Sequence, residues 1–334
     1  MMEIAKKLTK KEMKMRAREE RSEAEKVPRK VHLTPEKFVV EGCKALDSEE
    51  ILRPNLTYWQ DAWRRLKKNR VAFVALLLLI GLALMTVVGE AISGYSQEVT
   101  ESSIRNLWPS KAHWFGTDEL GRDLFARVWH GGRVSMIMGL VGATISTVAG
   151  CIYGGVAGYY GGRVDNMMMR VIEVLTTLPY LMVVILISLY LGNGIVPLIL
   201  AMTATGWCGM ARLVRGQILQ IKEQEYVLAA IALGASPWRI ITKHLLTNTL
   251  GIVIVSVTFD IPRFIFAEAF LSYIGLGVQA PNTSWGALAS ASQQNLMFYP
   301  YQLFFPALMI AATMLSFTLL GDGLRDALDP KLRQ

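Results

Sequence analysis

The sequence predicts an all-α membrane protein with six transmembrane helices. Of its 334 residues, 52% are hydrophobic and only 19% are charged, whereas soluble domains average about 25% charged residues. Apolar stretches of about 20 residues, the length that crosses a bilayer core, recur along the chain. Most of the excess positive charge precedes the first of these stretches. Together these observations exclude a soluble enzyme.

The net charge of +8 is concentrated at the N-terminus. Residues 1–70 contain 19 Lys and Arg against 12 Asp and Glu, which places a net charge of +7 before the first apolar stretch. Lys and Arg beside a first span hold that end of it on the cytoplasmic side. We therefore predict a cytoplasmic N-terminal tail over 1–70, with an interfacial amphipathic helix over 53–70, and no nucleic-acid partner.

The first apolar stretch predicts a transmembrane helix over 71–92, and the charged run before it distinguishes this helix from a cleavable signal peptide. The polar stretch 93–133 is expected to form an extracytoplasmic loop. Within it, apolar residues at helical spacing over 118–130 predict an interfacial helix capped by Thr117 or Asp118. Such a helix would either brace the membrane surface or frame the outer mouth of a pathway.

Five further transmembrane helices are predicted within a core domain over residues 134–322. Turn-forming residues at 192–194 divide the uncharged stretch 174–211 into two spans. The other three predicted spans cover residues 134–160, 245–276 and 303–321. Six crossings return the C-terminal tail, residues 323–334, to the cytoplasmic side, so that both termini and the basic 211–244 loop are cytoplasmic.

The 211–244 loop predicts two helices joined by a tight turn. Gly234 suits the left-handed residue that ends a helix, Ser236 can cap the next helix, and Pro237 fits its first turn. Neighbouring alanines keep the surface low. A partner protein could therefore approach the backbone of this projection closely.

This loop resembles the EAA loop of the permease subunits of bacterial ABC importers. The matching positions are Ala229, Ala230, Gly234, Ala235, Ile241 and Leu246. Leu228 and Thr247 depart from the motif, which has Glu and Pro there, and Glu225 is an alternative glutamate. The resemblance implies an ATPase-coupling loop made by Glu225, Ala229, Ala230, Gly234, Ala235, Ser236 and Pro237.

Further stretches resemble the C-type permease subunit of oligopeptide and dipeptide importers. They are Trp114–Asp123, Gly131–Ser135, Gly161–Asp165, Phe270–Gly277, Ser284–Gly286 and Gly321–Pro330. The resemblance implies the type I importer (MetI-like) fold in the cytoplasmic membrane and alternating access for peptides. It also implies a homologous B-type permease, two cytoplasmic ATP-binding subunits and an extracytoplasmic peptide-binding protein as partners.

Three charged residues interrupt the predicted span 245–276, namely Asp260, Arg263 and Glu268. Charges inside a bilayer are costly unless they face protein or water. We therefore expect this helix to line the pathway. Asp260 and Arg263 are three residues apart and can pair, and the alternative is that this pair only fixes packing against a partner subunit.

The sequence contains no motif for chemistry of its own. It lacks the phosphate-binding Gly-x-x-x-x-Gly-Lys-Ser/Thr, the HExxH pattern and a nucleophile elbow. The three cysteines, Cys43, Cys151 and Cys208, have no metal-ligand spacing. We therefore predict no catalytic residue, no metal site and no cofactor bound by this chain, with ATP and Mg²⁺ used by the partner ATPases.

Several alternatives remain open at this point. Within the importers, nickel, glutathione and oligosaccharide permeases resemble the same branch. Outside them, a channel would not depend on Gly234, and an ion-coupled secondary transporter would use Asp260 or Glu268 and lose uptake when its ion gradient collapses. An intramembrane enzyme would need a catalytic pair in its spans, which the sequence does not offer.

Overall fold

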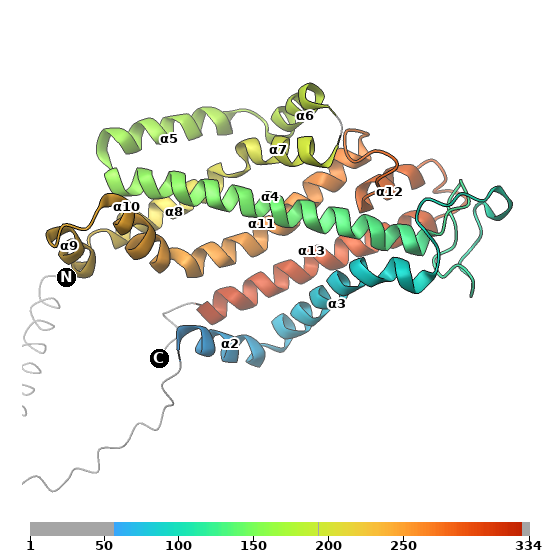
Figure 1. Ribbon diagram of the computed structural model, residues 1–334, viewed down its shortest axis with the longest axis horizontal. Helices are drawn as coiled ribbons and strands as arrows, with labels where there is room; N and C mark the ends of the chain where they lie inside the picture. The colour runs from blue at the N-terminus through green and yellow to red at the C-terminus, as the bar shows by residue number, and fades with distance from the viewer. Residues whose placement is uncertain (1–56, 193, 329–334) are drawn as a thin grey trace, which may run out of the picture. The chain divides into compact units, whose positions relative to one another are not determined.

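The computed structural model describes residues 57–192 and 194–328, and every regular element in these two ranges is a helix. The long helices lie alongside one another, and α4 extends along most of the bundle beside α3, α11 and α13 (Figure 1). Five helices are long and apolar enough to cross a membrane, and the bent pair α5 and α6 supplies a sixth crossing if it counts as one span. The all-helical prediction is confirmed. The predicted tail over residues 1–52 lies outside the described residues.

The chain enters through a short amphipathic helix, α2 (Tyr58–Lys68), followed directly by the first span, α3 (Arg70–Ser93). Asn69 separates them because its side chain accepts a hydrogen bond from the Ala72 amide at 3.2 Å and so caps α3. Leu66 of α2 is buried against α3 and α13. Helix α2 is therefore anchored to the bundle.

Helix α4 (Leu124–Tyr160) is one continuous helix of 37 residues. The separate interfacial helix over 118–130, capped by Thr117 or Asp118, was a wrong prediction, since Asp123 caps α4 by accepting from the Ala126 amide at 2.8 Å. The Asp118 carboxylate accepts from the backbone amides of Leu120 and Arg122, each at 2.9 Å. These bonds hold the residues before Asp123 in a turn instead of a helix.

The third crossing is bent. Helix α5 (Gly162–Thr177) and helix α6 (Tyr180–Leu191) meet at 83°, because Pro179 cannot continue the helix of the residues before it. The predicted span starting at residue 174 therefore begins inside α5. The predicted turn is confirmed at Gly192 and Gly194, both with positive φ, after which α7 (Ile195–Gly206) and α8 (Cys208–Ile221) form the fourth candidate span.

The remaining helices extend beyond their predicted bounds. The fifth candidate span covers Pro237–Tyr273 and comprises α10 (Pro237–Arg239), the π-helix η3 (Ile240–Leu246) and α11 (Thr247–Tyr273). The short helix α12 (Trp285–Ser292) was not predicted. Helix α13 (Tyr301–Leu328) is longer than the predicted 303–321, so the tail expected from residue 323 begins as helix.

Close glycine contacts hold α4 in the middle of the fold. A Cβ at Gly154 would lie 2.3 Å from the Ala211 carbonyl oxygen of α8, and one at Gly139 would lie 2.5 Å from Ile265 of α11. The small-residue face of α4 therefore packs directly on its neighbours, as expected for helices in lipid. Beside it, Met138, Met202 and Ile265 belong to the largest buried apolar cluster.

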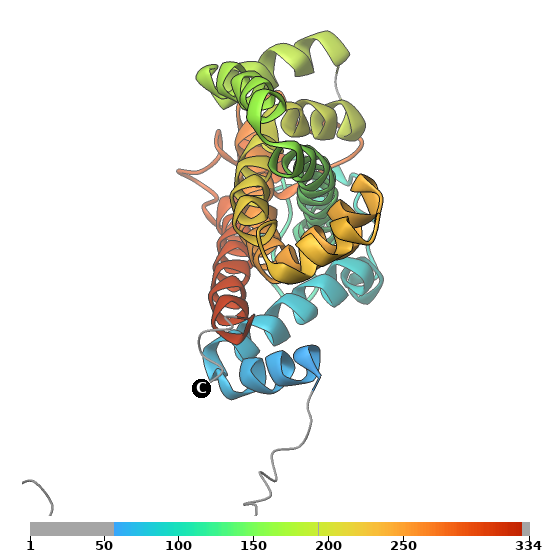
Figure 2. The same ribbon diagram turned by 90° about the vertical axis from the view of Figure 1, so that its left-hand side faces the viewer.

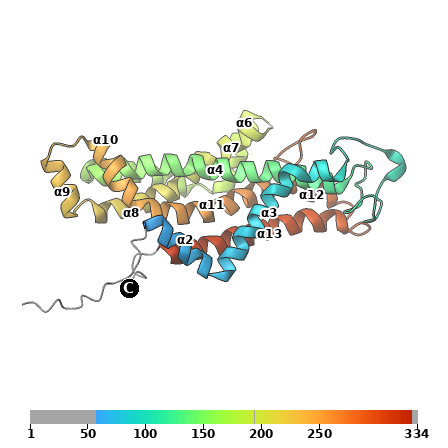
Figure 3. The ribbon, with the colours of Figure 1, turned by 60° about the horizontal axis from the view of Figure 1, so that its bottom comes forward.

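The two ends of the bundle carry different elements. Helix α9 (Glu225–Ala232) lies at one end, and the loop of residues 94–123 lies at the other (Figures 1 and 3). The Tyr58 hydroxyl donates a hydrogen bond to the Leu328 carbonyl at 3.4 Å, so the described ends of the chain lie together. This proximity agrees with an even number of crossings.

Candidate functional site

The coupling segment, defined here as residues 222–240, projects from the end of the bundle that faces the viewer in Figure 2. Helix α9 is fixed to the bundle by Val227, which is fully buried in a cluster with Ile240, Ile241 and Leu245. The last three residues belong to η3, which continues directly into α11. Helix α9 therefore packs directly against the start of the fifth span.

A glycine turn ends α9 as the sequence predicts. Gly234 has φ of +77°, and its amide donates to the Ile231 carbonyl at 2.9 Å. The Ala235 amide donates to the Ala230 carbonyl at 3.0 Å. These two bonds define a Schellman motif, in which the left-handed residue favours glycine. A Cβ at Gly234 would meet no atom within 4 Å, so the backbone conformation and not internal space selects glycine.

The turn leads into the next helix with one departure from prediction. Pro237 occupies the first position of α10, where its missing amide hydrogen costs nothing. Ser236 occupies the N-cap position, but its side chain makes no capping hydrogen bond, so the predicted cap was wrong. Its backbone carbonyl instead accepts from the Ile240 amide at 3.0 Å.

Large apolar side chains are exposed on the coupling segment. We call them the apolar tip, and they are Tyr226, Leu228, Ile231, Leu233 and Trp238. Leu233 is 87% exposed and Trp238 is 57% exposed. Exposed apolar patches of this kind mark protein contacts. Sequence reasoning singled out the alanines and Glu225, of which Glu225 and Ala229 are exposed and Ala230 and Ala235 half-buried, and missed the larger side chains beside them.

An ion pair fixes the helix that leads into the coupling segment. Arg215 of α8 binds both carboxylate oxygens of Asp165 of α5, at 2.5 and 2.6 Å. Lys222 donates to the Gly158 carbonyl of α4 at 3.3 Å. Both contacts lie just before α9 in the chain. They position the end of α8 against α4 and α5, and sequence reasoning quoted Asp165 only as part of a motif.

The two charges predicted to pair on the fifth span do so. The Arg263 guanidinium lies 3.5 Å from the Asp260 carboxylate, and it also lies over the Tyr180 ring of α6, 5.8 Å from its centroid. The Asp260 side chain is 22% exposed and that of Arg263 is 55% exposed. The pair therefore faces outward from this chain in the middle of a spanning helix.

Glu268 is placed differently from the other two charges. Its side chain has no exposed surface, and its carboxylate accepts from Ser135 at 2.8 Å and from Ser272 at 2.7 Å. Ser284 lies 3.4 Å from the Ser272 hydroxyl. The structure thus separates Glu268 from the Asp260 and Arg263 surface with which sequence reasoning grouped it. It joins α4, α11 and the start of α12 instead.

The Gly-Thr-Asp-x-x-Gly-Arg-Asp stretch forms a cluster of ion pairs and hydrogen bonds at the opposite end of the bundle. Asp118 pairs with Arg122 at 2.7 Å and with Arg127, and Asp123 pairs with His113 at 2.9 Å. The Thr117 carbonyl accepts from the side chains of Tyr301 and Gln302, both at 3.0 Å. This stretch therefore fastens the loop to the starts of α4 and α13. Its polar residues are occupied by structural contacts.

The sequence of this chain was compared with family profiles and with known proteins. The profile of the family described as "binding-protein-dependent transport system inner membrane component" matches residues 146–334, and that of the "N-terminal TM domain of oligopeptide transport permease C" matches residues 57–109. The chain is 52% identical to the dipeptide transport system permease protein DppC of Bacillus subtilis, over 93% of this chain and 98% of the relative.

Two further relatives are oligopeptide transport system permease proteins. Identity to OppC of Bacillus subtilis is 46%, over 89% of this chain and 97% of the relative. Identity to OppC of Escherichia coli K12 is 40%, over 86% and 95%. The chain therefore belongs to the binding-protein-dependent ABC transport permeases of the oligopeptide and dipeptide type, with the type I importer fold.

Proposed function

We propose that this chain is a transmembrane subunit of an ATP-driven importer that moves oligopeptides or dipeptides across the cytoplasmic membrane by alternating access. The observation that carries the proposal is the coupling segment, which presents an exposed apolar tip on a rigid connection to the fifth span. The names of the relatives, which are dipeptide and oligopeptide transport permeases, support peptide as the cargo.

The partners are those that the resemblance to peptide importers implies. Two cytoplasmic ATPases bind ATP and Mg²⁺ and dock on the coupling segment, and this sequence has no phosphate-binding loop of its own. A homologous B-type permease lies opposite the face of the fifth span that carries Asp260 and Arg263, and the cargo pathway runs between the two subunits. An extracytoplasmic peptide-binding protein delivers the cargo at the loop of residues 94–123. This chain itself holds no cofactor.

Energy enters through contact and not through chemistry in this chain. Closure of the ATPases on ATP displaces α9, and Val227 passes the displacement to η3 and α11. Because Arg263 of α11 lies over Tyr180 of α6, the same movement changes the spacing of these helices along the pathway. The subunit pair then alternates between inward-open and outward-open states. The N- and C-termini are cytoplasmic in this orientation.

Copurification tests this proposal. The chain is co-expressed with its genomic neighbours, and the purified assembly is reconstituted in lipid with the binding protein, with and without peptide. We expect two ATPases and a second permease to copurify, and ATP hydrolysis to rise with peptide-loaded binding protein. A chain that purifies alone would contradict the proposal, as would uptake that follows an ion gradient while ATP is present.

A further inference from the structure

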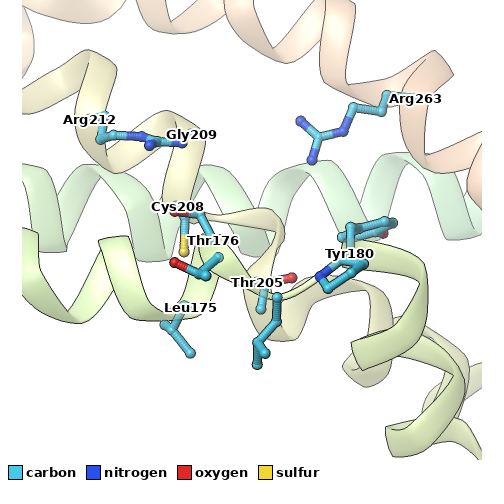
Figure 4. Close-up of a pocket in the computed structure, with 11 residues that line it drawn as sticks. Leu175, Thr176, Tyr180, Thr205, Cys208, Gly209, Arg212 and Arg263 are labelled. Carbon is cyan, nitrogen blue, oxygen red and sulfur yellow. The ribbon is translucent and has the colours of Figure 1, made fainter.

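A cavity of about 340 Å³ lies at the bend between α5 and α6 (Figure 4). Its lining includes Thr176, Tyr180, Thr205, Arg212 and Arg263, which come from five different helices. This volume is within the range of small-ligand sites. The 83° bend at Pro179 lies here, beside the junction at Trp207 that joins α7 to α8 within one candidate span. Discontinuous helices form the ligand sites of many transporters.

The cavity carries an excess of positive charge. Arg263 is matched by Asp260 at 3.5 Å. In the part of the chain that the structure describes, Arg212 makes no ion pair, and it is exposed where it lines the cavity. Two guanidinium groups and one carboxylate therefore leave one positive charge uncompensated. A guanidinium favours a carboxylate partner, to which it donates charge-assisted hydrogen bonds.

Both arginines lie before the C-terminal ends of their helices. Arg212 is nine residues before the end of α8 at Ile221, and Arg263 is ten residues before the end of α11 at Tyr273. At 1.5 Å per residue these separations are about 14 and 15 Å. An arginine within a spanning segment faces water, protein or an anion. Two guanidinium groups that line one cavity, with a single carboxylate paired to one of them, therefore suit an anionic ligand.

A hydroxyl group on the same wall also lacks a partner. Thr205 Oγ1 is enclosed and makes no hydrogen bond among the described residues. Thr203, two residues earlier on α7, donates to the Ile199 carbonyl at 2.8 Å, whereas Thr147 and Thr313 in other spanning helices share with Thr205 the lack of a partner among the described residues. Enclosed polar atoms without partners are uncommon in proteins. Thr205 thus adds a hydroxyl group without a partner to the lining of the cavity that Arg212 and Arg263 also line.

We propose that this cavity binds the C-terminal carboxylate of the peptide cargo, with Arg212 and Arg263 as donors. The inference rests on the proposed peptide import. The C-terminal carboxylate is the anionic group that unmodified peptides share whatever their side chains, so one subsite can serve cargo of varied sequence. The carboxylate of an acidic side chain offers the same chemistry, and the experiment separates the two.

The test measures ATP-driven uptake by the complete importer in proteoliposomes. Trialanine with a free carboxylate is compared with the same peptide as its C-terminal amide, in the wild type, Arg212→Gln and Arg263→Gln. We expect each substitution to lower the acid-to-amide ratio of kcat/KM about tenfold, the loss of one charge-assisted hydrogen bond. Arg212→Lys should recover part of the loss. The binding protein is the same throughout, so its own preference for acid or amide cancels when the ratio of a variant is divided by that of the wild type.

Arg170→Gln is the matched control. Arg170 lies on α5 outside the cavity and pairs with Glu173 at 3.0 Å, three residues away, as Arg263 pairs with Asp260. Its removal should leave the ratio unchanged. Each complex is quantified by its copurified subunits, so that a loss of assembly is not read as a loss of recognition. If the binding protein rejects the amide, acid-peptide uptake by Arg212→Gln is compared directly with that of Arg170→Gln, and equal uptake overturns the proposal.

Two other results would overturn it. The first is that Arg212→Gln and Arg263→Gln change acid and amide uptake by the same factor, which leaves peptide import intact. The second is that the arginine substitutions lower the uptake of an amidated peptide with one aspartate by as much as they lower the uptake of the free acid. That result would assign the cavity to side-chain carboxylates. A wild-type complex that imports neither peptide with ATP contradicts peptide import itself.

Discussion

Glu268 lies near the C-terminal end of α11 with no exposed surface, and its carboxylate accepts hydrogen bonds from two serines. Ser135, Ser272 and Ser284 come from three of the stretches that resemble peptide permeases. Each stretch contributes a hydroxyl to one buried cluster, so these sequence features maintain the fold here. The pairing of Glu268 with Ser135, 133 residues away, follows only from the tertiary arrangement.

Removal of this carboxylate should destabilise the chain. Glu268→Leu leaves the Ser135 and Ser272 hydroxyls without their acceptor in a dry interior, at a cost of about 2 kcal/mol or more. Glu268→Gln keeps an acceptor and should cost less. Thermal unfolding of the purified assembly measures both variants. Equal melting temperatures for Glu268→Leu and the wild type would contradict the assigned role.

Gly234 tests the coupling segment at a single position. Because a Cβ there meets no atom of this chain, Gly234→Trp should insert into the membrane in normal amounts. Its φ of +77° adds backbone strain of about 1–2 kcal/mol for any other residue, and the indole ring would occupy the surface offered to a partner. We expect ATP-driven uptake to be abolished. Normal uptake by this variant would refute docking at this turn.

The sequence predicted the helical type of the spans, and its six crossings match the structure when the bent pair α5 and α6 counts as one span, but it did not predict the breaks or α12. A long stretch without charged residues indicates a span, and this signal located α3, α11 and α13. It did not show how far some of these helices continue beyond the apolar stretch. The 83° bend was missed because the apolar pattern continues through Pro179. The start of α4 was misplaced because Asp118 has the residue type of an N-cap, and only the fold shows that its carboxylate is used within a turn.

Helix α4 depends on close approach to α8. Gly154→Leu would drive a side chain into the Ala211 carbonyl, so we expect loss of the assembled protein from the membrane or a large fall in its melting temperature. Gly216→Leu is the matched control, because a Cβ at Gly216 on α8 meets no atom within 4 Å. Equal stability of the two variants would show that α4 and α8 do not pack as described.

The whole molecule divides its tasks between two ends. At one end, the buried ion pair of Asp118 and Arg127, the hydrogen bond between His113 and Asp123, and the Thr117 carbonyl fasten the loop of residues 94–123 to α4 and α13. At the other, the coupling segment leaves five large apolar side chains exposed. The sequence alone predicted the turn at Gly234 and the resemblance to a coupling loop. It did not predict the apolar tip, since the continuous apolar run of residues 226–233 does not show which of its side chains a fold will cover.

The central claim is that energy enters through the coupling segment, and Leu233→Glu tests it most directly. Leu233 is 87% exposed, so the change should not disturb this chain's own packing. Met297→Glu is the control, because Met297 is 89% exposed and precedes α13 at the opposite end. We expect Leu233→Glu to lose its copurified ATPases and its ATP-driven peptide uptake, and Met297→Glu to retain its ATPases. Full ATPase association and full uptake by Leu233→Glu would contradict the account.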